Sequence, residues 1–135
     1  MDDIRILSRE DALSAQDRDG EWVEVPKWGG RFWVAEFGGR ERDMWDRHIA
    51  SIAQGQLAID LDNIRARVVA LSVVDPETLR PVFSYDDVEQ LGRKSAASLD
   101  VIFQVATRLS GLDKGAIERL VDALKNALSS VSGVG

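Results

Sequence analysis

The chain has 135 residues, of which 44% are hydrophobic and 30% are charged, a balance that excludes a disordered segment with too little apolar surface to fold. The formal net charge of −6 disfavours a dedicated nucleic-acid binder, because binding to phosphates needs clustered positive surface. The absence of cysteine excludes disulfides and thiolate metal sites and suits a reducing cytoplasm.

The first residues lack the features of an export signal. Met1-Asp2-Asp3-Ile4 provides neither the basic region nor the apolar stretch of a signal peptide. The longest wholly apolar runs, such as VVAL at residues 68–71, are far too short to span a bilayer. We therefore expect a cytoplasmic protein that contacts no membrane, with one domain over residues 1–128 and a flexible tail over residues 129–135.

The N-terminal part is predicted to contain a short helix and a hairpin. Ser8 and the acids after it indicate a helix start, because the hydroxyl satisfies a free amide and acids favour the positive end of the helix dipole. This helix should end near Ala15. β-branched and aromatic residues predict strands over residues 22–25 and 31–36. The two glycines after Trp28 place the hairpin loop there.

Two helices are expected next, from apolar residues at helical spacing. The first spans residues 40–53, and the second follows a polar loop at residues 54–56. Asp60 or Asp62 is the expected N-cap of the second helix. The apolar stripes are Trp45, His48, Ile49 and Ile52 in the first helix, and Leu61, Ile64, Val68 and Leu71 in the second.

The middle of the chain has short apolar segments at residues 73–74 and 82–83, on either side of a proline-bearing loop. This pattern predicts a small hairpin. Ser84 is the expected cap of the next element, with Asp87 at the position that a capping box gives to Glu or Gln. This element should end at Gly92.

The strongest amphipathic pattern begins near Ser95 and ends at Ser110-Gly111, which predicts a long helix. Its core-facing stripe should be Leu99, Ile102, Phe103, Ala106 and Leu109. A last helix is expected over residues 113–128. Together these elements predict an α+β fold that is mostly α, with an N-terminal β-hairpin packed on a bundle of about four to five helices.

No residue pattern indicates a catalytic, cofactor-binding or metal site. His48 is the only histidine, so a histidine pair for zinc is excluded and a hydrolytic triad lacks its usual partners. The acids within residues 86–89 fall in a first helical turn, where the helix dipole alone explains them. The glycine pairs at 29–30 and 38–39 lack the lysine and the spacing of a phosphate loop. We therefore expect a protein that is not an enzyme and needs no cofactor.

Three of the four tryptophans, Trp22, Trp28 and Trp33, lie in the predicted hairpin. Strand alternation places Phe32 on one face and both Trp33 and Phe37 on the other. One face can pack on the helices, and exposed aromatic residues on the other are typical of binding sites. We predict that Trp28, Trp33 and Phe37 bind a partner. The alternative, in which the monomer covers both faces, stays open at this point.

Three parts of the chain resemble the tail assembly chaperones of long-tailed bacteriophages and prophages. VPKWGG at residues 25–30, followed by GRERD at 39–43, resembles the opening of these small proteins. LSVVD at 71–75, FS at 83–84 and DDVEQLG at 86–92 resemble their middle part. The stretch from KSAA at 94–97 to RLSGL at 108–112 resembles their long helix. The resemblance extends over residues 6–112.

The resemblance implies a protein of the host bacterial cytoplasm that is absent from the mature virion. Its partners would be the tape measure protein and the major tail (tube) protein, and self-association into a homo-oligomer is a further expectation. One departure is FGG at residues 37–39, where similar proteins more often read Leu-Thr-Gly. The threonine hydroxyl that would cap the following helix is then missing.

A different class of function is a helix-turn-helix regulator that uses the predicted helices over residues 86–91 and 95–109. The net charge opposes binding to DNA. The second helix also offers only Arg108 as a basic residue for phosphate contacts. We therefore expect no nucleic-acid partner and favour the tail assembly chaperone.

Overall fold

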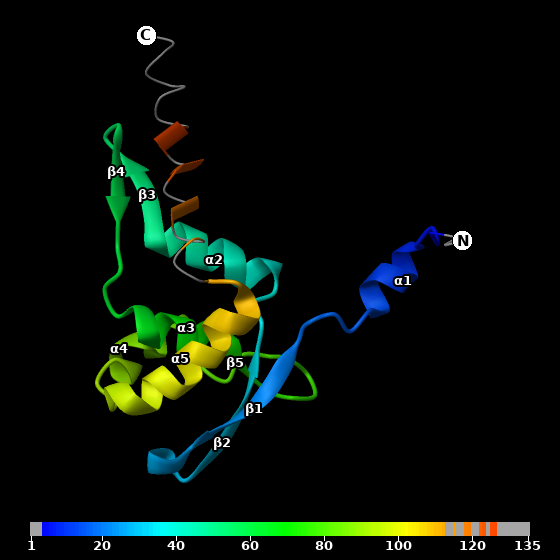
Figure 1. Cartoon of the computed structure of the whole chain (residues 1–135), viewed down its shortest axis with the longest axis horizontal. Helices are drawn as coiled ribbons and strands as arrows, with labels where there is room; N and C mark the ends of the chain where they lie inside the picture. Colours follow the sequence, from blue (N-terminus) through cyan, green and yellow to red (C-terminus); the bar gives the residue numbers. More distant parts are fainter. Residues whose placement is uncertain (1–3, 113–114, 116–117, 120–121, 124, 127–135) are drawn as a thin grey trace.

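The computed structural model describes residues 4–112, 115, 118–119, 122–123 and 125–126 (Figure 1). The helix expected over residues 113–128 lies mostly outside the described residues. The tail expected over residues 129–135 lies wholly outside them, as does the boundary between domain and tail.

An antiparallel sheet is built from the N-terminal hairpin and one later strand. β1 (Gly20–Val25) and β2 (Gly30–Ala35) are joined by the 3-10 turn η1 (Pro26–Trp28), and β5 (Val73–Val74) lies on the other side of β2. Gly29 closes the turn at φ +77°, a left-handed conformation that glycine adopts without steric cost. The register places Trp22 opposite Trp33 and Val23 opposite Phe32, which confirms the predicted hairpin.

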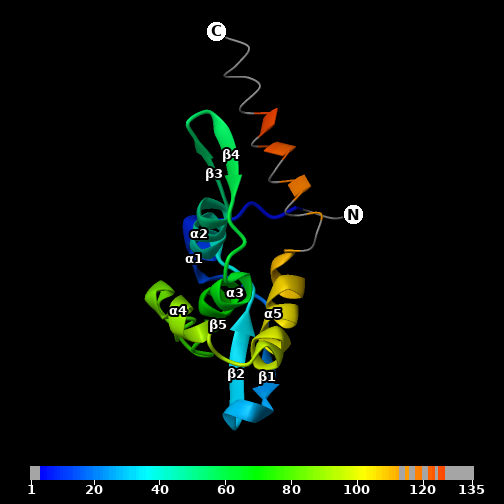
Figure 2. The ribbon, with the colours of Figure 1, turned by 90° about the vertical axis from the view of Figure 1, so that its left-hand side faces the viewer.

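Helices cover one face of this sheet. α5 (Ala96–Ser110) packs against β1 and β2, and α3 (Ile64–Ser72) packs against α5 (Figure 2). The buried core residues from these elements include Val23, Val25, Val34, Val68, Val69, Leu99, Ile102 and Ala106. Phe103 and Leu109, also predicted for the core, are only partly buried. The fold is α+β, with an N-terminal hairpin packed against helices, as the sequence predicts.

Residues 50–59 form a second hairpin where a helix end and a loop were expected. α2 (Gly39–Ile49) is followed directly by β3 (Ala50–Ala53), which pairs with β4 (Gln56–Ile59). Gln54 and Gly55 have φ angles of 54° and 75°, and positive values at both positions are typical of a two-residue hairpin turn. The prediction that Ile52 continues the helical stripe is wrong, because its backbone lies in β3 opposite Leu57.

The start of α3 also differs from the prediction. Asn63, and neither Asp60 nor Asp62, directly precedes this helix, and its Nδ2 donates to the carbonyl oxygen of Val88 at 3.2 Å. Asp60 instead accepts hydrogen bonds from Asp62 N and Arg67 Nη2, both at 2.9 Å. These two contacts lower the pKa of Asp60 below its ordinary value.

Serine residues begin two elements at the predicted positions. Ser8 precedes α1 (Arg9–Ser14), and its hydroxyl accepts a hydrogen bond from Asp11 N. Ser84 precedes the 3-10 turn η2 (Tyr85–Asp87) and α4 (Val88–Leu91), and its amide donates to Asp87. The small hairpin expected around the proline loop is reduced to one bridge, between Val74 and Pro81, because β5 pairs with β2.

Candidate partner-binding surface

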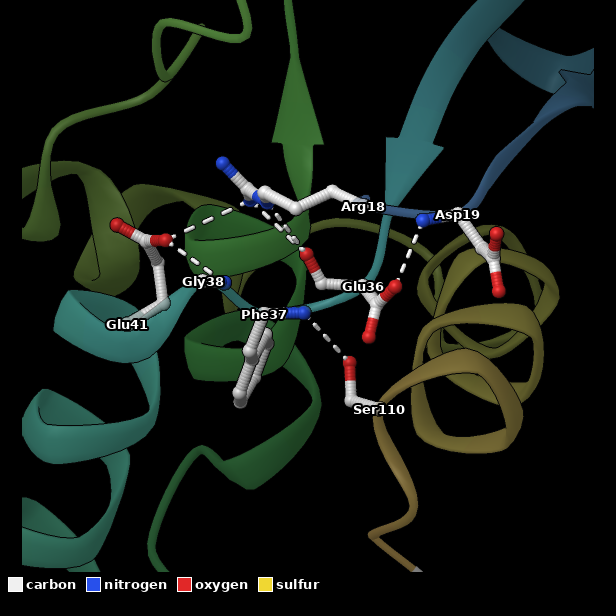
Figure 3. A network of polar contacts seen from close by, with 7 residues as sticks. All are labelled: Arg18, Asp19, Glu36, Phe37, Gly38, Glu41 and Ser110. Carbon is white, nitrogen blue, oxygen red and sulfur yellow. Dashed lines mark hydrogen bonds and ion pairs between the residues drawn. The ribbon is translucent and has the colours of Figure 1, made fainter. Parts of the chain in front are cut away.

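The end of β2 is a junction between several elements (Figure 3). Arg18 Nε and Nη2 donate to the carbonyl oxygen of Glu36 at 3.1 and 2.9 Å. The same guanidinium lies 3.5 Å from Glu41 Oε1 in α2. Asp19 N donates to Glu36 Oε1 at 2.7 Å. These contacts tie the linker before β1 to the end of β2 and to the start of α2.

Glu41 compensates for the missing hydroxyl cap of α2. Its Oε1 accepts a hydrogen bond from Gly38 N at 3.0 Å, which satisfies an amide beside the helix N-terminus. Its carboxylate also lies in the first turn, where negative charge is favoured by the helix dipole. The departure from the resembled sequence at residues 37–39 therefore leaves a helix start at Gly39.

Phe37 belongs to the core. Its side chain is 9% exposed, and its ring centroid lies 6.1 Å from that of Trp45 in α2. Its backbone amide donates to Ser110 Oγ at the end of α5, at 3.0 Å. Because β2 ends at Ala35, strand alternation does not extend to Phe37. This burial contradicts the exposed position expected from the sequence and removes Phe37 from the candidate surface.

Trp28 lies apart from Trp33. Its ring packs edge-on against Phe32 with the centroids 6.0 Å apart, and Phe32 lies 5.8 Å from Phe83 in the same manner. All three rings are partly buried against the core. Since Phe32 and Trp33 point to opposite faces of β2, Trp28 does not join Trp33 in one surface. A contact between Trp28 and a partner stays a prediction.

The sheet face opposite the core carries Trp22 and Trp33 together, and we call it the Trp22–Trp33 face. The two rings are cross-strand partners in an edge-to-face arrangement, with centroids 5.2 Å apart and an interplanar angle of 76°. Trp22 is 45% exposed, and the guanidinium carbon of Arg31 lies 4.1 Å from its ring centroid. Gly20 makes room for Trp33, because a β-carbon at residue 20 would lie 2.6 Å from the indole.

A cleft of about 500 Å³ borders Trp33. Its walls come from the linker before β1 and the loop after β5, and include Gln16, Arg18, Pro76 and Leu79. Asp75 shapes this loop by accepting hydrogen bonds from Thr78 N and Glu77 N, both at 2.9 Å. These bonds lower the pKa of Asp75. The exposed aromatic pair thus lies beside a recess that can receive an apolar side chain.

Sequence reasoning missed Trp22 as a member of this surface. In a hairpin closed by residues 26–29, Trp22 and Trp33 are directly opposed, and opposed residues share a face. Counting cross-strand pairs outward from the loop is the signal that identifies it.

The surroundings of His48 resemble a packing contact. The imidazole is exposed and stacks on the ring of Tyr85, with centroids 4.3 Å apart and planes at 15°. Burial is the main cause of the raised pKa of Tyr85. Within the described residues, no group of three His, Asp or Glu side chains is placed to hold a metal ion. The absence of catalysis remains a prediction.

The elements that a helix-turn-helix regulator would use are α4 and α5. α4 has four residues, and α5 buries Leu99 and Ile102 against the sheet and α3. Arg108 Nη2 lies 2.6 Å from Glu21 Oε1, so the basic group expected to contact phosphate is already paired. In the part of the chain that the structure describes, no helix combines the length and apolar character of a membrane span.

Comparison of the chain with protein-family models, with curated proteins and with solved structures found no match. The sequence motifs and the geometry of the Trp22–Trp33 face therefore carry the functional assignment.

Proposed function

We propose that this protein is a non-catalytic tail assembly chaperone of a long-tailed bacteriophage or prophage, which binds the tape measure protein and tail tube subunits during tail assembly. The ordered motifs within residues 25–43, 71–92 and 94–112 support this family, because their combination is more specific than any one of them. It acts in the host bacterial cytoplasm and is absent from the mature virion, which mass spectrometry of purified particles can check. The exposed Trp22–Trp33 face is the observation that carries the binding role.

The chemistry of this face suits an apolar client. The long apolar helices of a tape measure protein must stay soluble until tube subunits polymerise around them. Tryptophan is enriched among the residues that contribute most to binding energy, and Trp22 exposes much of its ring. The contacts of Trp22 with Trp33 and Arg31 restrict the ring before binding, which reduces the entropy lost on association.

Charged residues adjoin the aromatic pair. Glu24 and Arg31 are cross-strand partners on the same face as Trp22 and Trp33. An apolar centre with a polar rim is the usual arrangement of a protein–protein interface. The net charge of −6 favours solubility of a complex with an apolar client.

The test is to replace Trp22 and Trp33 by serine in separate variants and to measure co-purification with the tape measure protein of the same phage. Circular dichroism first establishes that each variant is folded. We expect Trp22→Ser to weaken binding by about 30-fold, the equivalent of the roughly 2 kcal/mol that a central interface tryptophan contributes.

Val101→Ser is the matched control, because Val101 is 41% exposed on α5 and lies outside the Trp22–Trp33 face. This variant should bind like the wild-type chain. Undiminished binding by both folded tryptophan variants would contradict the assignment of this face. Equal losses in the tryptophan variants and in Val101→Ser would do so as well.

A further inference from the structure

The N-terminal arm, residues 4–14, exposes large apolar side chains that no other element covers. The exposed fractions are 92% for Ile4, 94% for Ile6, 62% for Leu7 and 70% for Leu13. No residue of α1, which forms the end of the arm, is buried. Figure 1 shows α1 projecting from the body of the molecule, beyond the linker that leads into β1.

The arm is nevertheless locally ordered. Ser8 Oγ accepts a hydrogen bond from Asp11 N at 3.1 Å, and Asp11 Oδ2 accepts one from Ser8 N at 2.9 Å. Arg5 Nη2 lies 2.8 Å from the same carboxylate. An isolated helix of this length is marginal in water, so the capping box stabilises a turn that packing does not. The sequence thus specifies a helix whose apolar side chains have no partner within the described body.

A separate apolar cleft of about 670 Å³ lies between the start of α2, the end of α3 and residues 80–85. Its apolar lining includes Met44, Leu71, Pro81, Val82 and Phe83. Val82 is half exposed, so the cleft has an accessible wall. No described residue of the arm lines it.

The charges at the cleft are complementary to those of the arm. Arg40 and Arg80 line the cleft, and neither forms an ion pair with another described residue. α1 carries Glu10 and Asp11 between the apolar residues Leu7 and Leu13. An apolar helix with acids beside it therefore meets an apolar recess that has free guanidinium groups.

We infer that the arm of one copy occupies this cleft on a second copy, so that two protomers exchange arms. Arm and cleft belong to the same chain, so a two-fold axis makes both contacts at once and closes the assembly as a dimer. Arg18 fixes the root of the arm to Glu36 and Glu41, and from this root the arm leads away from its own body. The inference is independent of the proposed function, because it concerns the purified chain without a client.

Engineered cysteines test this exchange, because the natural chain has no cysteine. A Leu7→Cys chain is mixed with a Val82→Cys chain that carries a mass tag, and oxidised glutathione supplies the oxidising equivalents. We expect a disulfide-linked dimer of mixed mass on a non-reducing gel. Val101→Cys, which is similarly exposed outside the cleft, replaces Val82→Cys as the control and should give little of this product.

Sedimentation velocity of the chain without cysteines provides the second measurement. We expect a monomer–dimer equilibrium that Ile6→Ser with Leu7→Ser weakens by at least about 100-fold, because each arm loses two buried apolar side chains. A wild-type chain that stays monomeric at all concentrations would overturn the inference. So would equal cross-linking to Val101→Cys, or an internal disulfide in a monomeric Leu7→Cys/Val82→Cys chain, which would place the arm in its own cleft.

Discussion

Replacing Phe37 by alanine tests whether this residue belongs to the core or to a binding surface. The ring is 9% exposed and packs against Trp45 with the centroids 6.1 Å apart. Truncating a buried phenylalanine to alanine costs about 3–5 kcal/mol of the free energy of unfolding. The backbone hydrogen bond from residue 37 to Ser110 Oγ does not depend on the ring, so the loss reports on the packing of the ring.

Urea unfolding followed by circular dichroism measures this loss. With an m-value of about 2 kcal/mol/M, a loss of about 4 kcal/mol lowers the midpoint by about 2 M. Trp22→Ala is the control, because it removes a larger ring from an exposed position. Its cost should stay within about 1.5 kcal/mol, the contribution of one aromatic pair. A loss for Phe37→Ala below about 1 kcal/mol, or equal to that of Trp22→Ala, would refute the core assignment.

Three further substitutions probe the junction, a loop and the expected lack of catalysis. Arg18→Met should destabilise the fold by about 1–3 kcal/mol in thermal melts, because the Glu36 carbonyl and the Glu41 carboxylate lose a partly buried partner. Since hydrogen bonds lower the pKa of Asp75, the wild-type chain should have a higher Tm than Asp75→Asn at pH 7, and this difference should shrink as the pH falls below about 4. A difference that grows on acidification would contradict the assigned bonds. His48→Gln should leave phage tail formation intact, and its loss in a folded variant that still binds partners would reopen the question of catalysis.

Elements with local signals in the sequence were predictable. Serine caps identified the starts of α1 and η2, because hydroxyl capping depends only on residues within one turn. The long stripe of α5 identified the helix that packs on the sheet, and its end at Gly111 follows from the left-handed φ of 67° there. The register of β1 and β2 followed from the glycines of the hairpin loop.

Elements that depend on tertiary contacts were not predictable in the same way. Ile49 and Ile52 fit a helical stripe, yet the chain leaves the helix at Ala50 and pairs across the turn at residues 54–55. Phe37 was assigned by extending strand alternation past Ala35. There the chain turns, and the contacts of Arg18 with Glu36 join residues that are 18 positions apart in the sequence. No local pattern indicates such a contact.

The most direct measurement of the chaperone function is the solubility of the tape measure protein when the two proteins are produced together. The tape measure protein is co-expressed with the wild-type chain, with Trp22→Ser, with Val101→Ser, or alone, and its soluble fraction is quantified after centrifugation. We predict a soluble tape measure protein with the wild-type chain and with Val101→Ser, and aggregation with Trp22→Ser or without any chaperone. A tape measure protein that is equally soluble under all four conditions would contradict the chaperone function, and solubility retained with folded Trp22→Ser would contradict the role of the Trp22–Trp33 face.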